Sequence, residues 1–90
     1  MPGDALAEIY CARIAAACSV AEVGDRDARM LPIMRELGGS CASWEPGDLA
    51  RVRAEVETCK PLCGDRGEAI CVKFLASVDR RLAAEAVRAA

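Results

Sequence analysis

Six cysteines are spread over a chain of only 90 residues, and they limit the folds open to it. Apolar residues make up 53% of the chain, but its only aromatic residues are Tyr10, Trp44 and Phe74. A domain of this size buries about 60% of the surface that its unfolded chain exposes, so a hydrophobic core alone gives marginal stability. Small domains with thin cores commonly add disulfides, a structural metal ion or a partner surface. We therefore expect the cysteines to supplement the core.

The apolar residues recur at helical spacing, and β-branched residues are scarce. Glycines and prolines divide this pattern into four segments. The predicted helices are Ala5–Val23, Asp25–Leu37, Asp48–Cys59 and Arg66–Arg88. Pro32 is expected to delay or kink the second helix, and Gly38 and Gly39 to end it. We predict one all-α domain over residues 1–90, a small bundle of three to four helices with an antiparallel hairpin stapled by disulfides.

Disulfides between the first and last helices are the favoured role for the cysteines. Cys11 and Cys18 lie two turns apart on one apolar stripe, and Cys63 and Cys71 have a similar spacing. Antiparallel packing of these segments would align the cysteines as rungs of a ladder. The predicted pairs are Cys11–Cys71, Cys18–Cys63 and Cys41–Cys59. An alternative set, which matches the depth of Cys18 along the helices better, is Cys18–Cys71, Cys59–Cys63 and Cys11–Cys41.

Two other roles for the cysteines stay open. Free cysteines behave as small hydrophobic residues and often occupy helix seams. Four thiolates could instead hold an iron-sulfur cluster or a structural zinc ion, and the candidate ligands are Cys41, Cys59, Cys63 and Cys71. A thiol-redox enzyme is disfavoured because the chain has no C-x-x-C pair.

Composition disfavours several classes of function. The chain has no histidine, which excludes Ser-His-Asp and Cys-His catalysis. The net charge is −2 with the basic residues dispersed, so we expect no nucleic-acid partner. The longest run without charge, Ile14–Ala21, is far shorter than the roughly 20 residues of a membrane span, and the N-terminal residues do not resemble a cleaved targeting peptide. We expect no enzymatic activity and no cofactor.

Paired cysteines on two antiparallel helices resemble the twin CX(n)C, coiled-coil-helix-coiled-coil-helix proteins of the mitochondrial intermembrane space. The resemblance covers residues 11–71, with Cys11-x6-Cys18, Cys59-x3-Cys63 and Cys63-x7-Cys71 in place of the two C-x9-C or two C-x3-C pairs of that family. It implies import without a cleaved presequence, oxidation by the disulfide relay of that compartment, and service as a small accessory subunit of a respiratory complex.

The expected function is therefore that of a non-catalytic accessory subunit, on the intermembrane-space side of a respiratory-chain complex. Its partners would be protein subunits, and it would reach the membrane only through them. The interface candidates are Trp44, Leu82 and Val87, although a lone tryptophan in a loop more often covers a small core. The alternatives are a cytoplasmic iron-sulfur or zinc thiolate sensor and a small reduced adaptor or inhibitor.

Overall fold

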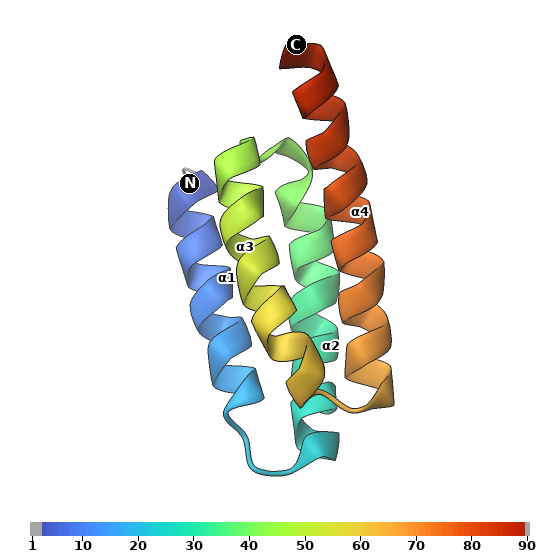
Figure 1. Cartoon of the computed structure of the whole chain (residues 1–90). Helices are drawn as coiled ribbons and strands as arrows, with labels where there is room; N and C mark the ends of the chain where they lie inside the picture. Colours follow the sequence, from blue (N-terminus) through green and yellow to red (C-terminus); the bar gives the residue numbers. More distant parts are fainter. Residues whose placement is uncertain (1–2, 90) are drawn as a thin grey trace.

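Four α-helices form most of the protein, which a computed structural model describes over residues 3–89. They are α1 (Gly3–Cys18), α2 (Val23–Ser40), α3 (Pro46–Cys59) and α4 (Asp65–Ala89), and two short 3-10 helices, η1 (Cys41–Ser43) and η2 (Lys60–Leu62), lie in the connections (Figure 1). The described residues contain no strand. The prediction of an all-α bundle is confirmed. None of these helices combines the length and the apolar character that crossing a membrane requires.

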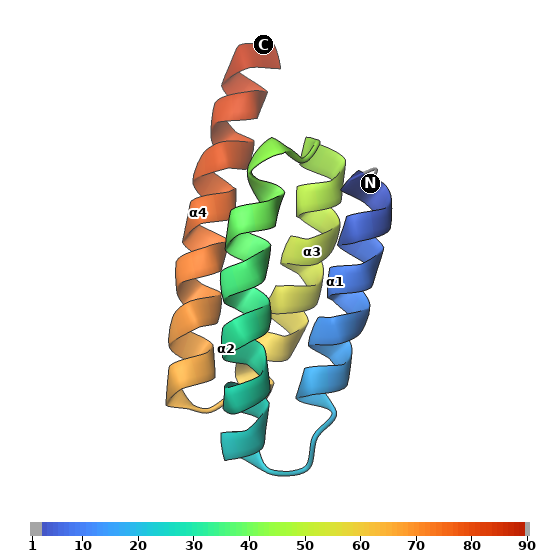
Figure 2. The same ribbon diagram turned by 180° about the vertical axis from the view of Figure 1, so that it is seen from behind.

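The helices alternate in direction along the chain, and each packs against two others. α1 packs against α2 and α3, and α4 packs against the same two helices. Figure 2 shows α2 and α4 side by side. α1 and α4 lie on opposite sides of the bundle, although the sequence predicts a disulfide-stapled hairpin between these two helices. No two cysteines lie at disulfide distance, so the staple is not confirmed.

The second helix is longer than the sequence predicts at both ends. It continues through Gly38 and Gly39 because both keep a negative φ, as an α-helix requires. Pro32 lies inside it, with its ring on the exposed face, where water can hydrate the carbonyl group that loses its hydrogen-bond donor. The first helix is shorter than predicted and ends at Cys18.

The apolar residues that recur at helical spacing form most of the core, whereas Cys11, on the predicted apolar stripe of the first helix, is only partly buried. Trp44 is 4% exposed and its ring lies 5.9 Å from that of Tyr10. Of the two roles considered for Trp44, the interface role is therefore wrong and the core role is confirmed, since its ring packs in the core, where it covers one end of the bundle. The other buried apolar residues are Ala7, Ile14, Ala17, Cys18, Met30, Ile33, Met34, Leu37, Cys41, Leu49, Val52, Val56, Cys59, Cys71, Phe74, Leu75 and Val78.

Asp27 joins the start of α2 to the start of α4. Its Oδ1 accepts a hydrogen bond of 2.8 Å from the backbone N–H of Gly64, and its side chain fills the space that a Cβ on Gly64 or Gly67 would need. A carboxylate in this position satisfies a free N–H and interacts favourably with the dipole of α4. The two glycines thus allow a buried carboxylate to fix the first turn of the longest helix.

Arg81 holds the other end of the bundle. Its guanidinium donates hydrogen bonds to the carbonyl oxygens of Cys41, at 2.6 Å, and Trp44. These contacts fix α4 to the connection between α2 and α3. Beyond this point α4 extends past the other helices (Figure 1). Leu82 still packs against the core, whereas Val87 is 77% exposed on the projecting turns.

Candidate functional site

Four of the six cysteines meet at one end of the bundle. Cys18 is the last residue of α1, Cys59 is the last residue of α3, Cys63 follows η2, and Cys71 lies in the second turn of α4. The thiol of Cys63 interacts with those of Cys18 and Cys71, and the thiol of Cys18 also interacts with that of Cys59. The four side chains therefore lie close together, with the thiols of Cys18 and Cys63 at 4.0 Å and 3.4 Å from the carbonyl oxygen of Cys59, and we call these four residues the thiol row.

Backbone carbonyl groups accept the remaining thiol hydrogen bonds of the row. The Cys59 thiol donates to the carbonyl oxygen of Ile14 at 3.9 Å, and the Cys63 thiol to that of Cys59 at 3.4 Å. Cys18, Cys59 and Cys71 are buried, whereas Cys63 is only partly buried. Cys63 is thus the member of the row that solvent reaches most easily.

Burial raises the pKa of every thiol in the row. It raises the pKa of Cys18 and of Cys71 to about 12, and neighbouring thiols add to the shift. The pKa of Cys63 rises to about 11 for the same reasons, with a further contribution from the Asp27 carboxylate. The thiols are therefore protonated at neutral pH, so the row lacks the low-pKa thiolate of an activated nucleophile.

The two remaining cysteines lie away from the row. The Cys11 thiol is 3.8 Å from the carbonyl oxygen of Arg51, and Cys11 and Cys71 belong to helices on opposite sides of the bundle. Cys41 and Cys59 lie at opposite ends of α3, whose 14 residues span roughly 21 Å. A disulfide needs its Cα atoms within about 7 Å, so the predicted pair Cys41–Cys59 is wrong. Of the first predicted set, only Cys18 and Cys63 have thiols that interact. Of the alternative set, Cys59 and Cys63 lie next to each other, with the Cys63 thiol 3.4 Å from the carbonyl oxygen of Cys59.

Three of the four predicted metal ligands, Cys59, Cys63 and Cys71, lie in the thiol row, whereas Cys41 lies at the far end of the bundle. Cys18 lies beside Cys59 and Cys63 where the prediction placed Cys41. Among the side chains that the structure describes, no group of three or more Cys, Asp or Glu residues is arranged to hold a metal ion.

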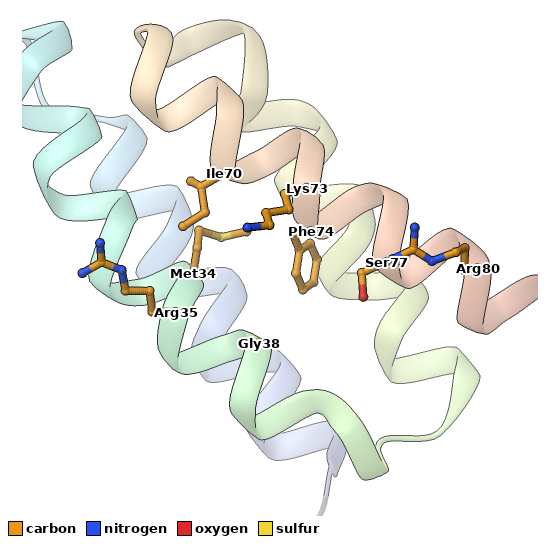
Figure 3. A pocket seen from close by; sticks show the side chains of 8 residues that line it. All are labelled: Met34, Arg35, Gly38, Ile70, Lys73, Phe74, Ser77 and Arg80. Atoms are coloured by element: carbon orange, nitrogen blue, oxygen red, sulfur yellow. The ribbon is translucent and has the colours of Figure 1, made fainter.

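A groove lies on the surface between α2 and α4. Its volume is about 350 Å³, and Met34, Phe74 and Ile70 form an apolar floor between the two helices (Figure 3). Gly38 and Ser77 leave the groove open because their side chains are small. A neighbouring hollow shares Ile70 with this one and extends it towards Leu31.

Cationic side chains line this groove throughout. Arg35, Lys73 and Arg80 line the main hollow, and Arg66 lines its extension. Neither hollow is lined by a carboxylate. Within residues 5–88, none of the four cations forms an ion pair or a side-chain hydrogen bond, whereas Arg13, Arg53 and Arg88 are paired with acidic residues elsewhere. We call the two hollows together the basic groove.

Sequence reasoning did not find the basic groove. Lys73, Ser77 and Arg80 follow one another at helical spacing, which marks one face of α4. Arg35 joins them only because α2 packs beside α4, and no pattern within either helix indicates that neighbour.

Neither a family model, a curated protein nor a solved structure matches the chain.

Proposed function

We propose that this protein is a non-catalytic accessory protein that binds an acidic, amphipathic segment of a partner protein in the basic groove. The observation that carries the proposal is the combination of an apolar floor with four cations that have no partner among the described residues. Cations with no internal counter-charge favour an acidic ligand through Coulomb attraction. The apolar floor favours a ligand with a hydrophobic face.

A protein segment fits this chemistry better than the other anionic partners. An amphipathic helix presents apolar side chains at intervals of three and four residues and keeps its carboxylates at the sides, as a groove with an apolar floor and charged rims requires. The residues around the floor offer no exposed aromatic side chain on which a nucleic-acid base could stack, since Phe74 is 8% exposed. Met34 can adapt its shape to different apolar side chains.

The cellular compartment in this proposal rests on the resemblance to twin CX(n)C proteins, which are found in the mitochondrial intermembrane space. The partner would be a subunit of a respiratory-chain complex that faces the mitochondrial intermembrane space, with a cytoplasmic partner as the alternative. Mass spectrometry of proteins that copurify with the native complex tests the assignment. Recovery of respiratory-chain subunits supports it, and recovery of cytoplasmic proteins alone contradicts it.

The groove itself is tested with a synthetic probe. The probe is a fluorescent peptide of about 18 residues that places leucine on one helical face and glutamate on the other. We expect it to bind, and to bind more weakly as salt screens the charges. Lys73→Glu combined with Arg80→Glu should weaken binding about tenfold or more, because two attractions become repulsions at the rim.

The matched control is Arg29→Glu combined with Arg51→Glu. Both side chains are exposed and lie outside the basic groove, and the change in net charge is the same. This variant should change the affinity less than about threefold, through long-range attraction alone. Equal losses in the two variants, or equal binding of a scrambled peptide, contradict a groove-specific site. Tighter binding of anionic vesicles or an oligonucleotide than of the peptide would assign a different class of partner.

A further inference from the structure

Three of the four cations of the basic groove recur every seven residues along α4. They are Arg66, Lys73 and Arg80. Seven residues make almost two turns of an α-helix, so the three side chains leave α4 on nearly the same side, at intervals of about 10.5 Å. Together they form a line about 21 Å long, which we call the cation column.

The two hollows of the basic groove follow one another along this column. Arg35, Ile70 and Lys73 line both of them, and their volumes are about 350 and 480 Å³. Apolar side chains from α2 and α4 form the floor, and Lys73 and Arg80 stand beside it on α4 (Figure 3). A ligand that lies along the groove therefore meets an apolar surface on one face and the cation column along one edge.

The rim formed by α2 carries only one cation, Arg35. This residue lines both hollows, so it lies near the middle of the groove. The other lining residues from α2 are uncharged, namely Leu31, Met34 and Gly38. The two rims are therefore unequal, and the greater positive charge lies along α4.

No acidic neighbour neutralises the cation column. Within the part of the chain that the structure describes, none of its three members forms an ion pair with a carboxylate. Asp79, which precedes Arg80, is instead bound to Arg53 of α3 at 2.5 Å. The charge of the column is thus available to a ligand from outside the chain.

We propose, on the basis of the function proposed above, that the partner segment is an α-helix of about 15 residues or more with three carboxylates seven residues apart along one edge. Such a helix repeats its carboxylates at the same intervals of about 10.5 Å as the cation column. Charged residues beside the seam between two helices select partners in the same way. An extended strand cannot match the column, because its residues about 10 Å apart are three positions apart and point to opposite faces.

Two fluorescent peptides of about 18 residues test the spacing. Both have the same composition, with leucine on one helical face and three glutamates as the only charged residues. The matched peptide places the glutamates seven residues apart on one edge, whereas the clustered peptide holds them within one turn. We expect the matched peptide to bind about fivefold more tightly, because its carboxylates reach three cations instead of one. Circular dichroism checks that the two peptides are equally helical.

A pair of adjacent glycines tests whether the helix lies in the groove. Gly38 lines the groove and Gly39 does not, and a Cβ on either residue would meet no atom within 4 Å. Gly38→Trp places an indole ring where the partner helix would pack, so it should weaken binding of the matched peptide about tenfold. The control, Gly39→Trp, should change the affinity less than about twofold.

The spacing can fail while the proposed function holds. Equal affinities of the two peptides, both lowered by Lys73→Glu combined with Arg80→Glu, would overturn the spacing and leave an acidic ligand in the basic groove. Equal losses in Gly38→Trp and Gly39→Trp would overturn the position of the helix. Failure of both peptides to bind, or binding that the double variant leaves unchanged, would overturn the proposed function as well.

Discussion

At the scale of single residues, Asp27 shows how a charge can be buried in so small a protein. It is the only buried charged side chain among those described, and its carboxylate accepts the backbone N–H of Gly64 at the start of α4. Burial of an unpaired carboxylate is costly, whereas a helix N-terminus supplies both a hydrogen bond and a favourable dipole. Gly67 is required because a Cβ there meets both Asp27 and Cys63.

Gly67→Ala tests this close approach. The added methyl group should displace the Asp27 carboxylate and lower the free energy of unfolding by about 2 kcal/mol, measured by urea denaturation. Gly39→Ala is the control, because a Cβ at this helical position meets no atom within 4 Å. It should stabilise the protein by about 0.5 kcal/mol through its higher helix propensity. Equal effects at the two positions contradict the steric role of Gly67.

The thiol row predicts how stability depends on pH. In the unfolded chain the thiols ionise near their ordinary pKa of 9.0, whereas in the folded protein Cys18 and Cys71 hold their protons to about 12. The unfolded state therefore loses protons first, and the stability that is present below about pH 9 is lost as the pH rises towards 12. Urea denaturation of the reduced protein between about pH 8 and pH 10 measures this decline. Cys71→Ala should make it less steep, and an unchanged slope contradicts the assignment.

At the scale of elements, the sequence predicts each helix better than it predicts how the helices are arranged. The apolar seams of the four helices enter the core as expected, because periodicity determines which face is buried. The same periodicity does not say which helices are neighbours. The predicted ladder therefore joined α1 to α4, which lie on opposite sides of the bundle, and the basic groove between α2 and α4 was missed. Both roles for Trp44 stayed open in the sequence because a loop position does not reveal that its ring folds back against Tyr10.

Substitution of Arg81 tests whether its hydrogen bonds anchor α4 to the rest of the bundle. Arg81→Met keeps much of the side-chain volume and removes both hydrogen bonds to the connection between α2 and α3. Loss of two charge-assisted hydrogen bonds should lower the free energy of unfolding by about 2 kcal/mol. Arg80→Met, next to it on the exposed face, should change stability by less than about 0.5 kcal/mol. Thermal denaturation of the two variants measures the difference, and similar melting temperatures would show that Arg81 does not anchor α4.

At the scale of the whole molecule, charge is distributed unevenly although the net charge is only −2. Four cations gather along the groove between α2 and α4, and the described ion pairs lie outside it. Such a surface attracts an acidic partner within about one Debye length, roughly 8 Å at physiological ionic strength. The rest of the protein carries a net negative charge. The proposed binding face thus lies along one side of the bundle, with the thiol row at one end of the core.

Site-specific photo-crosslinking in cells of the source organism tests the binding face most directly. A photoreactive amino acid replaces Ser77 in the basic groove or, as the control, Thr58 on the exposed face of α3. We predict that the probe at position 77 crosslinks to one partner protein, within an acidic amphipathic segment, and that the probe at position 58 does not. Identical crosslinks from both positions, or crosslinks from position 77 to a segment without acidic residues, would contradict it.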